Sequence, residues 1–212
     1  MFPALYAILD FNSGLKENLS VAKSLAEAGV QLIQLRAKSA PSGEFFEASR
    51  ALNAELRSKG VRFIVNDRPD IAAMIDAGGV HVGQEDLPVE EARKICGGSR
   101  WVGVSTHNLE QFREAIRTSA DYIAVGPVFP TSTKENPDPV VGLELLRAVR
   151  PLTKKPIVAI GGITIESAEA VHRAGADSLA VVRDLASAAC PGERAREFLA
   201  IAARVRAGAQ SA

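Results

Sequence analysis

Two aspartates, each placed directly after a short apolar segment, have the residue type and spacing to bind a metal ion. Residues 63–65 are apolar and lead into Asn66 and Asp67, and residues 79–82 lead into a polar run that closes with Asp86. A helical pattern separates the two segments, so we interpret them as parallel strands whose carboxyl ends meet at one edge of a sheet. Two carboxylates beside an amide suit a hard cation such as Mg²⁺. The sequence therefore predicts a magnesium site at Asp67 and Asp86.

A second interpretation of these aspartates needs no ligand. Asp67 stands shortly before a helix that opens at Pro69, and Asp86 stands shortly before one that opens at Pro88. Aspartate is a favoured helix N-cap, and proline is a favoured first helical residue. Taken alone, either aspartate is explained by capping as well as by metal binding.

The segment Gln34-Leu35-Arg36-Ala37-Lys38 alternates polar and apolar residues, which places an amide and two cations on one face of a strand. Opposite two carboxylates, these groups would bind a phosphorylated ligand that a metal bridges to the acids. The structural alternative is that Arg36 and Lys38 form salt bridges to Asp67 or Asp86. We favour the ligand because further anion-binding features occur later in the chain.

Those later features are one long loop and two strand ends. The loop 126–140 carries three hydroxyls and a lysine, and long loops in compact domains usually have a function; these residues are Thr131, Ser132, Thr133 and Lys134. Gly161 and Gly162 follow an apolar segment, where bare backbone N–H groups can approach a phosphate. Val182 and Arg183 end the last apolar segment, where barrels commonly bind phosphate. A run of Ser and Thr is also ordinary turn chemistry, so the loop alone decides little.

The three histidines give no sign of a nucleophile pair. His81 lies within a predicted strand, and we expect it to be a hydrogen-bonded interior side chain. His107 follows Ser105 at a strand end and could contact a substrate, whereas His172 lies in a helix and is expected at the surface. Because no Ser or Cys is paired with a histidine in sequence, covalent catalysis is not predicted.

Eight apolar segments alternate with helical patterns, and these elements must position the polar side chains. Strands are predicted over 5–9, 31–35, 63–65, 79–82, 101–104, 122–125, 156–160 and 178–182, and helices over 20–28, 43–58, 70–77, 89–96, 108–118, 143–149, 164–175 and 193–206. Eight βα units in this length predict an α/β fold, a single-domain (β/α)₈ TIM barrel over residues 1–212 with its active site at the carboxyl ends of the strands and a frayed tail at 208–212. The runner-up is an open parallel sheet, which would leave two strand edges exposed.

Composition sets the broad class. The chain has 212 residues and is 47% hydrophobic, with 25 basic and 25 acidic side chains, so no overall charge attracts nucleic acid or an anionic membrane. Cys96 and Cys190 lack the number and spacing of a disulfide framework or a metal site, and we expect both to be packing residues in a reducing compartment. No basic region precedes the first apolar run, and no apolar stretch approaches a membrane span. We expect a cytoplasmic protein with small-molecule substrates, compatible with a homo-oligomer, with neither nucleic acid nor membrane as partner.

Taken together, six motifs resemble the thiamine phosphate synthase family. They occur in the family's order along nearly the whole chain: QLRAK from Gln34, NDRPD from Asn66, GVHVGQED from Gly79, GVSTH from Gly103, GPVFPTSTK from Gly126 and IGGIT from Ile160. The resemblance implies a (β/α)₈ barrel and a Mg²⁺-dependent transferase of thiamine biosynthesis. Such an enzyme joins 4-amino-2-methyl-5-(diphosphooxymethyl)pyrimidine to a thiazole phosphate, carboxylated or not, and gives thiamine phosphate and pyrophosphate.

The resemblance also implies residue roles. Pyrimidine diphosphate would be held by Gln34, Arg36, Lys38, Asn66, Ser105 and Lys134, and magnesium by Asp67 and Asp86. Thiazole phosphate would be held by Thr131, Ser132, Thr133, Gly162, Val182 and Arg183. The leaving pyrophosphate needs its developing charge neutralised, which gives Arg36, Lys38 and Lys134 catalytic roles beside the metal.

Two positions depart from the family's usual pattern. Ala37 replaces a glutamate, but residue 37 should face away from Arg36 and Lys38, so we expect little effect. Arg183 stands where serine is more common, and it could strengthen or crowd the phosphate site. Two alternative functions remain, a barrel that acts as a thiazole tautomerase and a non-catalytic protein that binds a thiamine precursor. Turnover with release of pyrophosphate discriminates the synthase from a sensor.

Overall fold

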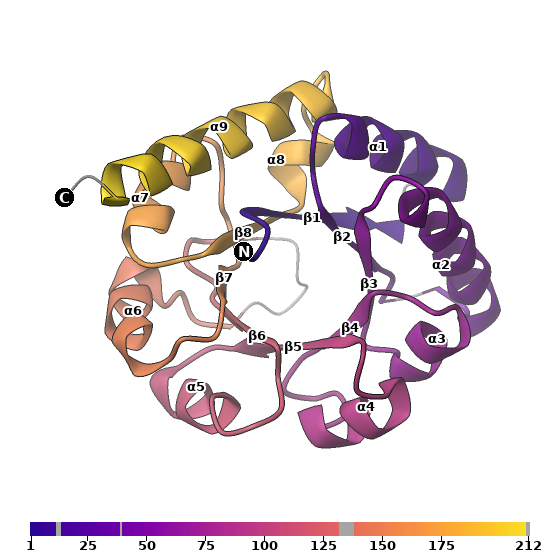
Figure 1. Cartoon of the computed structure of the whole chain (residues 1–212), viewed down its shortest axis with the longest axis horizontal. Coiled ribbons are helices and arrows are strands. Elements are labelled where there is room, and N and C mark those ends of the chain that lie inside the picture. The colour runs from indigo at the N-terminus through magenta and orange to yellow at the C-terminus, as the bar shows by residue number, and fades with distance from the viewer. Residues whose placement is uncertain (12–13, 39, 132–137, 211–212) are drawn as a thin grey trace.

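The protein is a closed parallel barrel of eight strands surrounded by helices (Figure 1). The structure is a computed structural model that describes residues 1–11, 14–38, 40–131 and 138–210. Its strands are β1 (Leu5–Asp10), β2 (Leu32–Arg36), β3 (Arg62–Asn66), β4 (Gly79–Val82), β5 (Trp101–Thr106), β6 (Tyr122–Val125), β7 (Ile157–Ala159) and β8 (Ser178–Val181). Each strand pairs with the next, and β1 pairs with β8 in parallel, so the predicted (β/α)₈ fold is confirmed and the open sheet is wrong.

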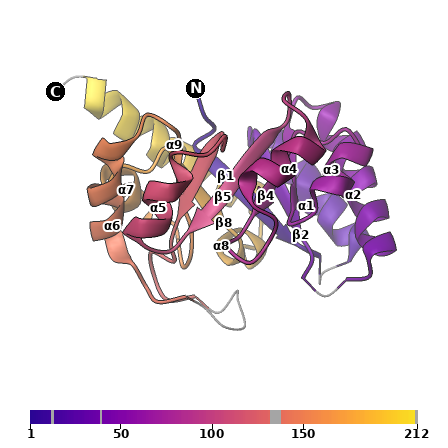
Figure 2. The same cartoon turned by 90° about the horizontal axis from the view of Figure 1, so that it is seen from below.

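The helices follow the strands in alternation and cover the outside of the barrel. They are α1 (Leu15–Glu27), α2 (Ser42–Arg57), α3 (Pro69–Met74), α4 (Val89–Cys96), α5 (Leu109–Ala115), α6 (Gly142–Val149), α7 (Ala168–Arg173), α8 (Arg183–Ala186) and α9 (Pro191–Gln210), with a 3₁₀ helix η2 (Arg150–Leu152) after α6. In the side view the N-terminus lies at one end of the barrel and α8 at the other (Figure 2). The carboxyl ends of the strands therefore open on the side of α8, where the polar residues should gather.

Most predicted elements occur, with boundaries that tertiary contacts shift. The first helix begins at Leu15, before the predicted residue 20, and its Asn18 amide donates to the carbonyls of Asp10 and Gly14 at 3.2 and 3.0 Å. Asn108 caps α5 as expected, since its side chain accepts from the Gln111 N–H at 2.9 Å. Helix α9 is described through Gln210, part of the way into the tail predicted at 208–212.

Two hydrophobic clusters divide along the alternation of the strands. The larger lies between the strands and the helices and includes Leu5, Ala7 and Leu9 of β1. The smaller fills the barrel interior and contains Tyr6, Leu32, Ile64, Tyr122, Ala124, Val158 and Ala180. Successive residues of a strand point to opposite faces, so the inward positions first close the base of the barrel with apolar and aromatic groups and then turn polar toward the mouth.

Two minor sequence expectations are wrong. His172, expected at the surface, is buried with its Nδ1 3.0 Å from the Ala176 carbonyl oxygen, because α9 packs over α7. Cys190, expected to pack, is exposed just before α9, whereas Cys96 is buried. Neither burial state could be predicted from the local sequence, because burial depends on how the helices pack against one another.

Gly103 generates a stability prediction. A Cβ added to Gly103 on β5 would overlap the ring of Tyr122, which is fully buried in the barrel. Gly103→Ala should therefore lower the free energy of unfolding by about 1–3 kcal/mol in urea denaturation. Gly98→Ala is the matched control, because nothing lies within 4 Å of an added Cβ there, and it should change stability by less than about 0.5 kcal/mol. Equal stability of the two variants would contradict the tight packing at Gly103.

Candidate active site

One large cavity, of about 810 Å³, opens at the carboxyl ends of the strands. Every predicted site residue that the structure describes lines it: Gln34, Arg36, Lys38, Asn66, Asp67, Asp86, Ser105, Thr131, Gly162, Val182 and Arg183. Ser132, Thr133 and Lys134 lie outside the described residues. Segments separated by most of the chain thus meet in one site, as expected for the mouth of a barrel.

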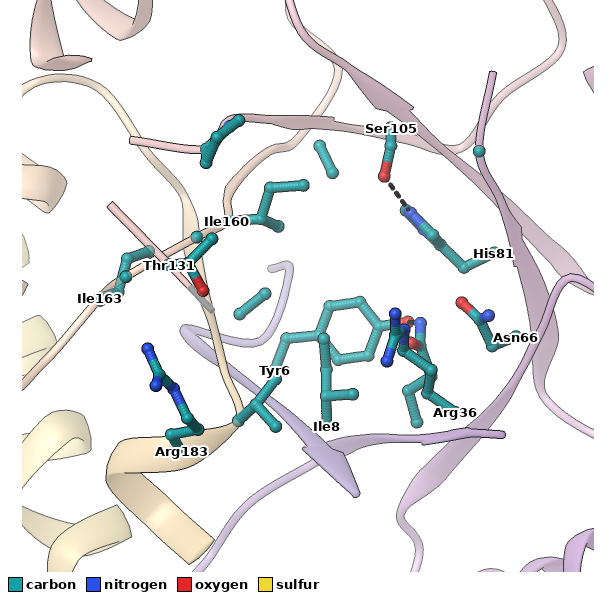
Figure 3. Close-up of a pocket in the computed structure, with 18 of the residues that line it drawn as sticks. Tyr6, Ile8, Arg36, Asn66, His81, Ser105, Thr131, Ile160, Ile163 and Arg183 are labelled. Atoms are coloured by element: carbon teal, nitrogen blue, oxygen red, sulfur yellow. Dashed lines mark hydrogen bonds between the residues drawn. The ribbon is translucent and has the colours of Figure 1, made fainter. Parts of the chain in front are cut away.

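The cavity has two sides that come from opposite parts of the barrel. In the close-up, Arg36, Asn66, His81 and Ser105 lie on one side, and Thr131, Ile163 and Arg183 lie on the other (Figure 3). The ring of Tyr6 and the side chain of Ile8 lie between them. A cavity of this form can hold two ligands, one against β2 to β5 and one against the loops that follow β6, β7 and β8.

The two aspartates come together, as the metal hypothesis requires. Asp67 follows β3 with a left-handed backbone, φ 59°, and its N–H donates to the His81 carbonyl on β4 at 2.8 Å. The Asp86 carboxylate accepts from the Gly83 N–H at 2.7 Å, within the turn after β4. The Asp67 and Asp86 side chains share a hydrogen bond. A non-glycine residue in this backbone region is uncommon and is held there by its surroundings.

The capping interpretation of the aspartates is wrong. The N-cap position of α3 is Arg68 and that of α4 is Pro88, and neither helix has a side-chain cap hydrogen bond. Asp67 and Asp86 are therefore not held by helix ends. Both residues line the cavity, and Asp86 acts on the Asp67 carboxyl there.

Electrostatics at the pair fit a divalent cation. Burial, the hydrogen bond with Asp86 and the charge of Asp86 raise the pKa of Asp67 to about 7, while the charges of Lys38 and Arg36 act in the opposite direction. Two close carboxylates that share a proton are relieved when a cation replaces it. Among the described residues no group of three or more His, Cys, Asp or Glu could hold a metal. Mg²⁺ is commonly bound by only one or two carboxylates together with substrate phosphates and water, so the pair fits that ion.

Two cations, Arg36 at the end of β2 and Lys38 just after it, stand beside the acids. Arg36 lies 4.0 Å from Asp10 at the end of β1, so the ion pair expected under the structural alternative is made with a different acid. Arg36 and Lys38 line the cavity and act on Asp67 through their charge. Their placement leaves positive charge facing the space next to the carboxylates, where a bound anion would lie.

Close packing, in addition to the predicted phosphate binding, explains why two glycines follow β7. Gly161 and Gly162 both have left-handed backbones, φ 89° and 66°. A Cβ on Gly161 would meet Pro127, and one on Gly162 would meet the Pro130 carbonyl at 2.5 Å. The start of the loop after β6 thus packs directly on this turn, and Thr131 and Gly162 line the same cavity.

Sequence reasoning missed the aromatic floor of the site. Tyr6 on β1 and Tyr122 on β6 lie inside the barrel, and Tyr6 lines the cavity. The interior, hydrogen-bonded state predicted for His81 is confirmed, because its ring nitrogens lie 3.1 Å from the Tyr122 hydroxyl and 2.9 Å from Ser105 Oγ. His107 also lines the cavity, with Nε2 3.4 Å from Asp138 Oδ2. A tyrosine at an inward position of a predicted strand was the signal available for the floor.

Fold and site together define a (β/α)₈-barrel enzyme whose mouth combines paired carboxylates, cations and a glycine turn. A family profile described as "Thiamine monophosphate synthase" matches residues 5–185. The chain belongs to this family.

Individual proteins similar to this chain carry names of the same family. The chain is 48% identical over 204 residues to a thiamine-phosphate synthase of Koribacter versatilis (strain Ellin345), covering 94% of this chain and 95% of the relative. It is 43% identical to a thiamine-phosphate synthase of Syntrophomonas wolfei subsp. wolfei, over 80% of this chain and 81% of the relative. Among solved structures, a thiamine phosphate pyrophosphorylase from Pyrococcus furiosus superposes with a TM-score of 0.86 at 36% identity, covering 95% of this chain and 96% of that one.

The raised pKa of Asp67 predicts how stability depends on pH in metal-free protein. In the unfolded chain an aspartate has a pKa near 3.9, so below about pH 4 the carboxyl is protonated in both the folded and the unfolded protein. As the pH rises, the unfolded chain loses this proton first, and the free energy of unfolding falls until the pH passes about 7, the pKa of Asp67 in the folded protein. Asp67→Asn should remove that loss. With chelator present, its unfolding temperature at pH 8 should exceed that of the native chain by several degrees, at roughly 2–4 °C for each kcal/mol. Near pH 4 the difference should shrink.

Asp70→Asn is the control for this measurement. Arg68 lowers the pKa of Asp70, so its replacement should reduce stability above pH 4, the opposite sign. Added Mg²⁺ should raise the unfolding temperature of the native chain more than that of Asp67→Asn. A metal-free Asp67→Asn variant that is less stable than the native chain at pH 8 would contradict the strained carboxyl pair.

Proposed function

We propose that this protein is a Mg²⁺-dependent thiamine-phosphate synthase, which joins the pyrimidine diphosphate to the thiazole phosphate and releases pyrophosphate. The observation that carries the proposal is the Asp67–Asp86 pair beside Arg36 and Lys38 at the mouth of a barrel of this family. The relatives' names support the same reaction. In the described residues, no helix is both long and apolar enough to span a membrane, and we keep the cytoplasm as the proposed location.

The two sides of the cavity would take the two substrates. Gln34, Asn66 and Ser105 would hold the pyrimidine ring, with Arg36, Lys38 and Lys134 on its diphosphate. Mg²⁺ held by Asp67 and Asp86 would neutralise charge on the diphosphate oxygens. The opposite side would hold the thiazole phosphate through Thr131, Ser132, Thr133, Gly162, Val182 and Arg183.

The reaction then requires positioning and charge neutralisation more than acid–base chemistry. The bond between the pyrimidine methylene carbon and the diphosphate oxygen breaks, and pyrophosphate departs with the electron pair. The thiazole nitrogen forms a new bond to the same carbon. Arg36 and Lys38 would stabilise the charge that grows on the leaving oxygen, and the two-sided cavity would hold the nitrogen close to the carbon.

The direct test is to supply both substrates to purified protein with and without Mg²⁺ and to measure pyrophosphate and thiamine phosphate. Both products should form in equal amounts and only with the metal. Asp86→Asn should reduce kcat/KM at least about tenfold and raise the Mg²⁺ concentration needed. Glu91→Gln is the control, because Glu91 pairs with Lys94 on the surface of α4. Folded protein that binds the pyrimidine diphosphate but never releases pyrophosphate would overturn the synthase and favour a sensor.

Arg183 provides a second test, because it occupies a position where the family usually has serine. It begins α8, two residues after the end of β8, and lines the cavity together with Gly162. A guanidinium there should strengthen phosphate binding. Arg183→Ser should therefore raise KM for the thiazole phosphate about tenfold and leave KM for the pyrimidine diphosphate unchanged. Arg173→Ser, on the outer surface of α7, should change neither constant. A lower KM for the thiazole phosphate in Arg183→Ser would show that Arg183 crowds the site.

A further inference from the structure

A chain of hydrogen bonds crosses the barrel interior and joins two residues of the pyrimidine side. The Gln34 amide nitrogen lies 2.6 Å from the Tyr6 hydroxyl, which lies 3.0 Å from the Tyr122 hydroxyl. Tyr122 lies 3.1 Å from His81 Nδ1, and His81 Nε2 lies 2.9 Å from Ser105 Oγ. These side chains come from β2, β1, β6, β4 and β5 in that order. Figure 3 shows the His81–Ser105 end of the chain at the cavity wall.

The three central members are enclosed. Tyr6, Tyr122 and His81 are 1%, 0% and 8% exposed. The ring of His81 also stacks on that of Tyr122, with centroids 5.5 Å apart. In such surroundings each polar hydrogen needs an acceptor, because a buried donor left unpaired is costly. The pattern of donors and acceptors along the chain is therefore restricted.

The amide nitrogen of Gln34 sets the direction. An amide nitrogen only donates, so the Tyr6 oxygen accepts from it. The proton of Tyr6 then has the Tyr122 oxygen as its acceptor, and the proton of Tyr122 has His81 Nδ1. With Nδ1 accepting, the ring proton of neutral His81 is on Nε2 and is donated to Ser105 Oγ. The hydroxyl protons of Tyr6 and Tyr122 and the ring proton of His81 then each have an acceptor.

The other tautomer of His81 breaks this pattern. With the proton on Nδ1, His81 would donate to Tyr122, and Tyr122 would donate to Tyr6. Tyr6 would then accept from both Tyr122 and Gln34, and its own proton would have no acceptor among the members of the chain. The arrangement of Gln34 therefore selects the Nε2–H tautomer of His81 on the far side of the barrel.

We propose that Tyr6, Tyr122 and His81 are positioning residues that fix the hydrogen-bond direction of the pyrimidine site. Because Ser105 Oγ accepts from His81, its own proton is directed to the ligand. Because the Gln34 nitrogen donates to Tyr6, the orientation of the amide is fixed, and its oxygen is assigned to accept from the ligand. The site thus selects a heterocycle that offers an acceptor to Ser105 and a donor to Gln34.

This inference rests on the proposed function and makes its substrate requirement specific. An aminopyrimidine offers ring nitrogens as acceptors and an exocyclic amino group as a donor. An analogue with an oxo group in place of the amino group would place an acceptor oxygen opposite the Gln34 amide oxygen, which is also an acceptor, so no hydrogen bond could form between them. The native chain should therefore reject the oxo analogue, since it leaves polar groups of the site unpaired.

The other two histidines supply an internal reference. Nδ1 of His107 contacts the Gly126 carbonyl, and Nδ1 of His172 contacts the Ala176 carbonyl. A carbonyl only accepts, so both of these rings carry a proton on Nδ1. His81 alone among the three histidines of the chain should be the Nε2–H tautomer with an unprotonated Nδ1.

The first experiment measures ¹⁵N chemical shifts of the histidine rings by NMR on the full-length, ligand-free protein above pH 7.5. Signals are assigned with His107→Gln and His172→Gln. We expect a protonated Nε2 and an unprotonated Nδ1 for His81 and a protonated Nδ1 for the other two. A proton on Nδ1 of His81 would overturn the proposal. Because this readout needs no substrate, it stands whether or not the chain proves to be a synthase.

The second experiment compares two replacements of His81. The amide N–H of glutamine lies near the position of histidine Nε2, so His81→Gln keeps a donor to Ser105, whereas the shorter asparagine keeps only the contact with Tyr122. His81→Asn should raise KM for the pyrimidine diphosphate about tenfold with KM for the thiazole phosphate unchanged, and His81→Gln should recover most of the loss. Equal losses in both variants, or a change confined to the thiazole phosphate, would overturn the proposal.

The third experiment uses Tyr122→Phe, which keeps the ring that packs on Phe2 and Trp101 and removes only the hydroxyl. His81 should then show both tautomers, and the preference for the amino over the oxo pyrimidine diphosphate should fall about tenfold. Thr106→Val is the matched control. It removes a buried hydroxyl of β5 that donates to the Ala124 carbonyl and takes no part in the hydrogen-bond series from Gln34 to Ser105. Thr106→Val should keep both the tautomer and the preference. An unchanged preference in Tyr122→Phe would overturn the proposal, whereas a native chain with no activity but the expected tautomer would refute only the proposed function.

Discussion

The parallel pairing of β1 with β8 brings strand ends from both ends of the chain to one mouth. Leu5 of β1 lies opposite Leu179 of β8 in this register, so residues almost the whole length of the chain apart become neighbours. Closure also satisfies the backbone groups that an open sheet would leave at its edges. The acids after β3 and β4, the cations at the end of β2 and just after it, and the glycine turn after β7 share a cavity only because the sheet closes.

The mouth concentrates groups that oppose folding, which is typical of a site built for a charged ligand. Asp67 has a left-handed backbone and a half-buried carboxyl next to that of Asp86, and its raised pKa reflects the cost of charging it there. Lys38 and Arg36 offset part of that cost. A cation bound by the two carboxylates, with an anion beside the β2 cations, would satisfy both sets of charges, so the ligands would complete the electrostatics that the chain leaves unbalanced.

Below the charged mouth, the barrel interior contains a series of hydrogen bonds that we interpret as running in one direction. Tyr6, Tyr122 and His81 fill space that aliphatic side chains commonly fill in such barrels, and they connect Gln34 with Ser105 across the floor. The aromatic rings below them, from Phe2 and Trp101, close the opposite end of the barrel. Site residues on different strands are therefore coupled through the interior and not only through the ligand.

The sequence by itself determined the order of strands and helices, the barrel and the residues of its mouth, because period-two alternation and strand-end polarity are local properties of the chain. Gln34, Arg36 and Lys38 could be assigned to one face for that reason. It left open whether Asp67 and Asp86 cap helices or face each other, and it placed His172 and Cys190 wrongly. Only the tertiary structure decided these points, and only it joined Tyr6, Tyr122 and His81. Burial and pairing between distant residues depend on how strands close and helices pack, and those contacts leave no local pattern in the sequence.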